Sequence, residues 1–239
     1  GQAPEEIELA RKRLELADLR TRLVEHELDL ATLLAELAAF ERRYRRVVGV
    51  RYAELDRLLA EIAGLEARLF PTEEKVRSRA KEAEEQARQS AREMGEGDSA
   101  TEGAFRPSGE LRKLYLDLAK RFHPDLATDA EERARRTGLM AELNRAYAVG
   151  DETAMRALLT HWQGNVDMAQ GEDIGAQLVS AIRNIAQVEA RLRAIATERQ
   201  NLLSSDLAKL WTQANIAMNT ALHQGGDLLA EMATDIERG

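Results

Sequence analysis

Leucine recurs at every seventh position across the first part of the chain. The series comprises Leu9, Leu16, Leu23, Leu30, Leu37 and Tyr44, with Leu19, Leu33, Phe40 and Val47 at partner positions and Ile7, Leu14, Leu28 and Leu34 in a second seam. Such a repeat places its members on one face of a helix that packs against another helix. The stripe is wider than a two-stranded coiled coil needs. Residues 5–48 therefore predict one long helix of a bundle, or of a hairpin that also forms a homodimer.

Gly49 allows two interpretations. A glycine after Arg45 and Arg46 suits a helix C-cap, but the segment 52–55 that follows has no N-cap residue. The apolar seam also shifts here, to Leu55, Leu58, Ile62, Leu65 and Leu69. We favour a continuous helix with a register stutter over a hairpin turn.

Proline and glycine divide the rest of the chain. Pro71 ends or kinks the helix, and residues 73–93 are so charged and Ala-rich that they predict a solvated single helix or spacer. Residues 94–106 and 162–172 predict linkers. The heptad stripe from Ile174 to Leu202, a break at 204–206 and a last helical stretch predict an antiparallel hairpin of 172–203 with 206–237.

The whole chain predicts an all-α fold in five consecutive parts. These are an N-terminal coiled coil (1–93), a linker (94–106), a central helical segment (107–161), a second linker (162–172) and a C-terminal helical hairpin (173–239). Charged residues make up 32% and aromatic residues 4% of the sequence, a composition typical of long helices and coiled coils, and no segment has the pattern of a strand.

Charge and hydropathy exclude several classes of partner. The net charge of −8 gives no reason to expect nucleic acid or an anionic membrane as a partner. No apolar run approaches membrane-spanning length and no signal peptide is visible, so we expect a cytoplasmic protein.

The sequence offers no residues for catalysis or for a cofactor. There is no cysteine, the four histidines are scattered without metal-ligand spacing, and no phosphate loop or Ser/His/Asp constellation is readable. We therefore expect neither an enzyme nor a bound metal.

Residues 107–147 carry the most specific signal in the chain. Ser108 is a candidate N-cap, followed by apolar residues with helical spacing at Leu111, Leu114, Tyr115, Leu118 and Phe122. Pro124 lacks an N–H and disfavours helical geometry at His123, so the helix should stop there. This leaves His123 and Asp125 on a tight turn that we expect to be exposed. A second helix with Met140, Leu143, Ala146 and Tyr147 should pack antiparallel to the first.

This segment resembles the J-domain of DnaJ-type co-chaperones. Arg112 to Asp125 follows the register of that family's helix II with its His-Pro-Asp loop, and Leu143 to Tyr147 follows helix III. The resemblance implies a J-domain co-chaperone whose loop and basic helix face contact a DnaK-type chaperone and stimulate its ATPase. The implied partner-binding residues are His123, Pro124, Asp125, Arg112, Lys113, Lys120 and Arg121. Coiled-coil arms would then choose an unknown client protein or a location.

Several features depart from the family pattern. A helix I has no clear counterpart, although Phe105 could fill the site where it would pack, and the usually basic middle of helix II is Leu116-Asp117. These departures, with the dominance of coiled coil, support an alternative: an elongated scaffold or adaptor whose degenerate J-like hairpin is an interaction surface only. In that case His123 and Asp125 would belong to an ordinary helix stop, and the four basic residues to an ordinary solvated face.

Overall fold

Every regular element in the described part of the chain is helical. The computed structural model describes residues 3–95, 103–127, 129–162, 173–221 and 234–236, and no strand occurs in these ranges. The predicted all-α class is confirmed. The chain forms two compact units, one from Gly1–Glu36 with Phe105–Ser204 and the other from Leu37–Ala104 with Ser205–Gly239. Both units combine segments that are distant in sequence, whereas the division predicted from the sequence was into consecutive parts.

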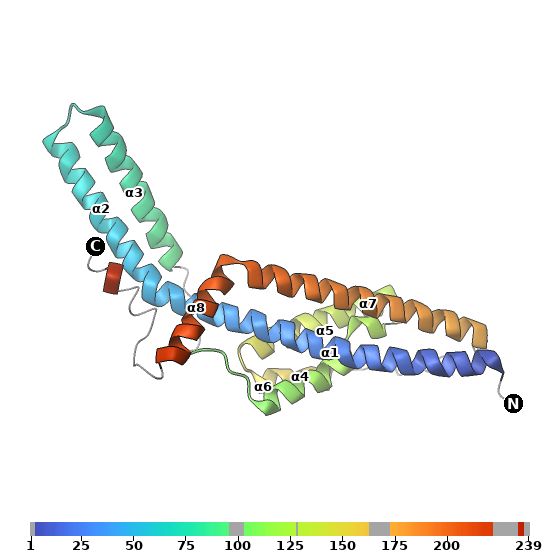
Figure 1. Cartoon of the computed structure of the whole chain (residues 1–239). Coiled ribbons are helices and arrows are strands. Elements are labelled where there is room, and N and C mark those ends of the chain that lie inside the picture. The colour runs from blue at the N-terminus through green and yellow to red at the C-terminus, as the bar shows by residue number, and fades with distance from the viewer. Residues whose placement is uncertain (1–2, 96–102, 128, 163–172, 222–233, 237–239) are drawn as a thin grey trace. The chain divides into compact units, whose positions relative to one another are not determined.

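Two long helices pack side by side in the first unit. Helix α1 (Pro4–Tyr44) contributes its N-terminal part, and α7 (Ile174–Ser204) runs alongside it (Figure 1). Their shared cluster contains Leu16, Leu19, Leu23, Leu30, Ile185, Val188 and Ile195. The leucines of the main seven-residue series are buried as predicted, whereas Ile7, Leu14 and Leu34 of the second seam are exposed.

Three shorter helices complete this unit. They are α4 (Gly109–Phe122), α5 (Ala130–Ala148) and α6 (Glu152–His161). The Tyr115 hydroxyl donates to Asn144 Oδ1 at 2.7 Å, and Arg136 Nη1 donates to the carbonyl of Arg121 at 2.6 Å. The first half of α4 thus faces the end of α5, and the end of α4 faces the first half of α5. This is the antiparallel packing that the sequence predicts. Ser108 caps α4 by accepting from the Leu111 N–H.

The apolar faces of these three helices close against α1. The cluster holds Leu111, Tyr115, Leu118, Ala119, Phe122, Met140, Leu143, Ala146, Tyr147 and Met155 together with Val24, Leu28 and Ala31 of α1. Phe105, which precedes α4, packs edge-on against Tyr147 with ring centroids 5.4 Å apart.

In the second unit the helical path is continuous through Gly49. A π-helical turn, Arg45–Gly49, joins α1 to α2 (Val50–Leu69), and Gly49 has the right-handed helical φ of −60° and ψ of −38°. The continuous helix predicted from the sequence is confirmed. A π turn takes up extra residues, which accounts for the shift of the apolar seam from Tyr44 to Leu55. A Cβ at Gly49 would lie 3.0 Å from Met94 Sδ, so this close contact favours glycine.

The interpretation of residues 73–93 as a solvated single helix is wrong. Helix α3 (Glu74–Gly95) folds back onto α2 after the break at Pro71 (Figure 1). Its half-buried positions alternate in steps of four and three and are mostly small: Val76, Ala80, Ala83, Ala87, Ser90 and Met94. Small side chains let two helix backbones approach closely, so this hairpin forms without the large apolar residues that the sequence analysis required.

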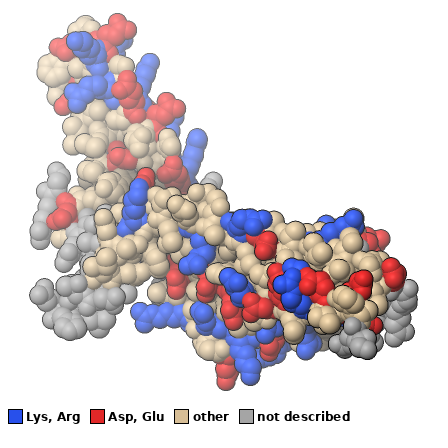
Figure 2. All heavy atoms as spheres, turned by 45° about the vertical axis from the view of Figure 1, so that its right-hand side comes forward, with Lys and Arg blue, Asp and Glu red and all other residues tan. Residues whose placement is uncertain are grey.

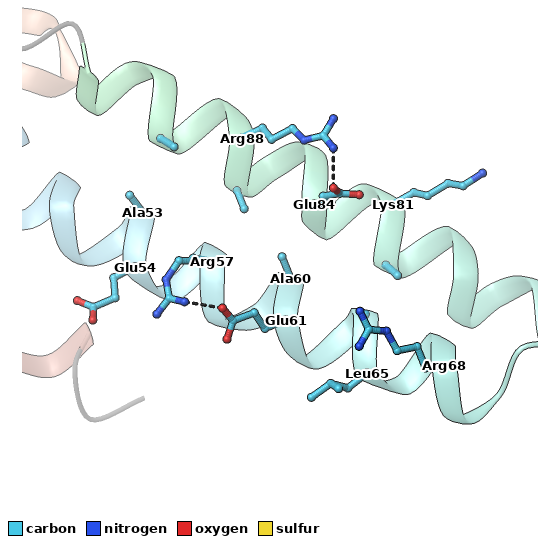
Figure 3. A pocket seen from close by; sticks show the side chains of 14 residues that line it. Ala53, Glu54, Arg57, Ala60, Glu61, Leu65, Arg68, Lys81, Glu84 and Arg88 are labelled. Atoms are coloured by element: carbon cyan, nitrogen blue, oxygen red, sulfur yellow. Dashed lines mark hydrogen bonds and ion pairs between the residues drawn. The ribbon is translucent and has the colours of Figure 1, made fainter.

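The groove along the α2–α3 hairpin has a volume of about 960 Å³. Figure 3 shows ion pairs within single helices here, Arg57 with Glu61 on α2 and Arg88 with Glu84 on α3. Alanines and Gly64 line much of the remainder. The groove therefore reflects the small side chains of the hairpin rather than a set of converging polar groups.

Helices α7 and α8 (Asp206–Ala221) belong to different units. Ser205 caps α8 by accepting from the Ala208 N–H, within the break at 204–206 that the sequence predicts. Leu207, Leu210 and Trp211 then pack with Phe40 and Val48. Among the described residues, the apolar residues of α7 and α8 thus lie in separate clusters, and the hairpin of 172–203 with 206–237 stays a prediction. Residues 96–102, 163–172 and 222–233, which include most of both predicted linkers, lie outside the described residues.

Two leucines of α1 test the assignment of the buried seam. Leu23 is 1% exposed and Leu14 is 75% exposed. Leu23→Ala should lower the free energy of unfolding of the first unit by about 2–5 kcal/mol, because it leaves a cavity in the α1–α7 core. Leu14→Ala is the control and should change it by less than about 0.5 kcal/mol. Urea unfolding followed by Trp162 fluorescence in a Trp211→Phe background reports on this unit, and equal losses would contradict the assignment.

Candidate functional site: the His-Pro-Asp turn

The turn begins where α4 loses its hydrogen-bonding pattern. Helix α4 ends at Phe122, and Pro124–Leu126 form a short 3-10 turn. The His123 N–H still donates to the carbonyl of Ala119, after which proline removes the next backbone donor. The Leu126 N–H donates to the carbonyl of His123 at 3.0 Å, and the Ala127 N–H donates to that of Pro124 at 3.1 Å. Backbone hydrogen bonds on both sides of the proline thus fix the turn.

Arg136 of α5 holds the base of the turn. Its side chain is buried, and it donates to Glu132 Oε1 through Nε and Nη2 and to the carbonyl of Arg121 through Nη1. Its guanidinium carbon lies 4.8 Å from the centroid of the Trp162 ring, and that ring packs on Phe122. A planar guanidinium can make these polar and stacking contacts at the same time.

The four basic residues predicted to bind a partner lie along α4. Lys113, Lys120 and Arg121 are exposed. Arg112 is half-exposed, with Nη2 3.9 Å from Asp29 Oδ1 of α1. On the face drawn in Figure 2, basic and acidic side chains are interspersed and neither sign forms a large separate patch. The basic residues of α4 are accessible to a partner, but α1 supplies a competing carboxylate for one of them.

His123 points into the protein, which corrects the expectation of an exposed imidazole. It is 4% exposed. Nδ1 accepts from the Asp125 N–H at 3.2 Å, and Nε2 lies 3.5 Å from Glu27 Oε1 of α1. The sequence identifies the turn but not the helix that covers it, because Glu27 and His123 are far apart in the chain.

Glu27 joins three segments of the first unit. Its side chain is buried, and it accepts from Arg191 of α7 through Nε at 2.7 Å and through Nη2 at 3.1 Å, while His123 approaches from the turn. Burial alone would raise the pKa of Glu27, but the hydrogen bonds and charges of His123 and Arg191 outweigh it and hold that pKa below its ordinary value. Glu27 is therefore a buried carboxylate stabilised in its ionised form.

Asp125 is partly covered as well. Its Oδ2 is buried, lies 3.7 Å from His123 Nδ1 and has no hydrogen-bond partner among the described residues. A cavity of about 80 Å³ next to it is lined by Arg20, Lys120, His123 and Asp125 among others. Burial lowers the pKa of Arg20, and the charge of Asp125 opposes this effect. The carboxylate therefore lies in the field of a half-buried cation, Arg20, and no direct hydrogen bond joins the two side chains.

The sequence analysis missed the residues that surround the turn: Arg20 and Glu27 of α1 and Arg191 of α7. One signal could have indicated two of them. Arg20, Val24, Glu27 and Ala31 recur with helical spacing on α1, so two charged residues share a stripe with two apolar ones. A charge on a buried stripe requires a partner of opposite charge. The stripe does not indicate which segment supplies that partner.

The described residues contain no cluster of three or more His, Asp or Glu side chains that could hold a metal ion. Among the described helices, none combines the length and the apolar character needed to cross a membrane.

Comparison with known proteins adds no further identification, since no protein-family model, curated protein or solved structure matches this chain.

The lowered pKa of Glu27 predicts a specific pH dependence. The folded state favours the ionised carboxylate, so its contribution to stability is present above the unfolded-state pKa of about 4.5 and is lost as the pH falls through the lower folded-state pKa. Glu27→Gln should therefore cost about 1–3 kcal/mol near neutral pH, and this difference from the parent should shrink below about pH 4.5.

Glu25→Gln is the matched control, because Glu25 is exposed on the same helix. Its free energy of unfolding should follow that of the parent at every pH. Urea titrations between about pH 3.5 and 8, followed by Trp162 fluorescence in the Trp211→Phe background, measure all three proteins. If the difference in free energy of unfolding between Glu27→Gln and the parent stays constant as the pH falls, the lowered pKa of Glu27 is contradicted.

Proposed function

We propose that the segment from α4 to α5 is a J-domain-like docking module and that the protein is a co-chaperone of a DnaK-type ATPase. The observation that carries the proposal is the His-Pro-Asp turn at the junction of two antiparallel helices, with the J-domain register on both sides of it. Lys113, Lys120 and Arg121 remain exposed on α4, where positive charge can steer an acidic surface toward the turn.

The departures from the family pattern have a structural counterpart in this chain. Leu116 packs against the helical core. This position therefore carries an apolar core side chain where the family usually has a basic one. Phe105 and the α1 residues Val24, Leu28 and Ala31 cover the apolar face of the helix pair. We infer that they replace the helix I of the family, and that the J-like module here depends on α1 for its stability.

By resemblance to the family, Asp125 pairs with an arginine of the ATPase and Pro124 fixes the shape of the turn. The long helices outside the module then bind a client or fix a location, and the protein acts in the cytoplasm.

Single-turnover ATP hydrolysis by a DnaK-type chaperone tests the docking function. The parent should accelerate hydrolysis, and Asp125→Asn should reduce the rate to the basal value because it removes the charge that pairs with the ATPase. Asp18→Asn makes the same change at an exposed position of α1 and should match the parent.

Arg191→Glu is included because it replaces the Arg191–Glu27 ion pair with two facing carboxylates and so weakens the cover over the turn. No acceleration by the parent or by Arg191→Glu, with both folded by circular dichroism, would exclude the docking function.

A second candidate function is that of a dimeric scaffold, which the exposed face of α2 favours. Leu58, Ile62, Leu65 and Leu69 are 43–74% exposed and follow the alternating spacing of a coiled-coil seam. An antiparallel second copy would place Ile62 opposite Leu65 and Leu58 opposite Leu69. The same arrangement brings Glu61 of each copy, which pairs with Arg57 of its own helix, toward Arg68 of the other. This complementarity favours a second copy of the chain as the occupant.

Sedimentation tests the dimer. The parent should sediment at about twice the 26.7 kDa of one chain, and Ile62→Glu should sediment as a monomer because it places a charge in the seam. Leu14→Glu is the control, since Leu14 is exposed on α1 outside this seam. A monomeric parent at high concentration would rule out a homodimer.

A further inference from the structure

Resting on the docking function proposed above, we propose that α1 and α7 form a cap that closes the His-Pro-Asp turn to the ATPase. The contact of Glu27 with His123 and Arg191, which we term the latch, holds this cap shut. The chain would then carry its own inhibitor of docking: the parent stimulates the ATPase only while the cap is open, and an event that separates α7 and α1 from the turn raises this stimulation.

Burial of the turn is the first observation that supports the cap. A side chain that docks on a partner must be reachable, yet His123 is 4% exposed and Oδ2 of Asp125 is buried. Helix α7 also contacts the turn Pro124–Leu126. Elements outside the helix pair that presents the turn therefore cover His123 and partly cover Asp125, whose side chain is 20% exposed.

The composition of the contact is the second observation. A purely structural cover would need only apolar side chains, such as Leu23 and Val24, which line the cavity beside the turn. Instead, one buried carboxylate connects α1, α7 and the turn. A buried charge is stable only while its partners remain in place, so losing Arg191 or His123 leaves Glu27 uncompensated. The cap is thus held by an interaction that one substitution, or one competing charge, can weaken.

The exposure of Arg191 indicates where such competition could begin. The Arg191 side chain is 39% exposed while that of Glu27 is 6% exposed. A client or partner with an acidic group could reach Arg191 from solvent and draw it away from Glu27. Lys113, Lys120 and Arg121 remain exposed while the turn is covered. The capped protein can therefore meet an acidic surface of the ATPase before its turn becomes available.

Arg191→Glu in the full chain tests the cap, with Arg183→Glu as the matched control. Both substitutions make the same charge change on α7, and Arg183 is exposed. The first readout is the rate of C2-hydrogen exchange of His123 in D₂O, followed by mass spectrometry of its peptide. This readout reports the exposure of the turn without any chaperone present. The second readout is single-turnover ATP hydrolysis by the DnaK-type chaperone.

We expect Arg191→Glu to speed exchange at His123 roughly tenfold, the factor for losing one charge-assisted hydrogen-bonded pair, and to raise ATPase stimulation at equal concentration. Arg183→Glu should match the parent in both readouts. If Arg191→Glu does not fold by circular dichroism, Glu27→Gln replaces it and Glu25→Gln becomes the control.

The failures of the cap and of the docking function are distinguishable. Equal exchange and equal stimulation in all three proteins would overturn the cap and leave the docking function intact. Faster exchange in Arg191→Glu with stimulation by none of the three would overturn the docking function and the regulatory role together, although the latch would still hold the turn. Unchanged exchange with no stimulation would overturn both proposals.

Discussion

The first unit depends on how one buried carboxylate is compensated. Glu27 lies on the face of α1 that packs into the protein, where an isolated charge would be too costly to keep. Two hydrogen bonds from Arg191 and the approach of His123 compensate it, and each partner comes from a different part of the chain. We infer that the requirement to satisfy this charge selects the register of α7 against α1 and the position of the turn. Apolar packing alone would specify these positions less strictly, since leucine seams tolerate shifts of one turn.

The helices of the first unit and the α2–α3 hairpin of the second use different kinds of contact. In the first, leucines, isoleucines and aromatic rings interlock, as Leu23, Val188 and Tyr147 illustrate. In the second, α2 and α3 meet through alanines, so the backbones approach closely and the large side chains of α2 remain outside. The α2–α3 hairpin thus buries little apolar surface of its own and keeps an apolar stripe available for association.

Features that depend on neighbouring residues could be predicted from the sequence. The stop of α4 before Pro124, the caps at Ser108 and Ser205 and the buried leucine series of α1 follow from local rules. The α3 seam could not be predicted by a search for large apolar residues, because Ala80, Ala83 and Ala87 resemble those of a solvated helix. The cover of His123 could not be predicted either, because it depends on Arg191 and Glu27, which meet only in the folded chain. The His-Pro-Asp turn itself was identified, and its surroundings were not.

The π-helical turn at Arg45–Gly49 determines how α2 is rotated about its own axis relative to the end of α1. Each residue of a helix turns the chain by about 100°, so the residues gained or lost in this turn decide the direction that the stripe of α2 faces. With the length found here, the alanines of α2 are half-buried, whereas Leu58, Leu59 and Leu69 are exposed. Removing one residue would rotate the leucines toward the hairpin contact, where their size would force the two helices apart. The five residues of this turn thus set the direction of an apolar face that lies about 2.5 to 5.5 helical turns further along α2.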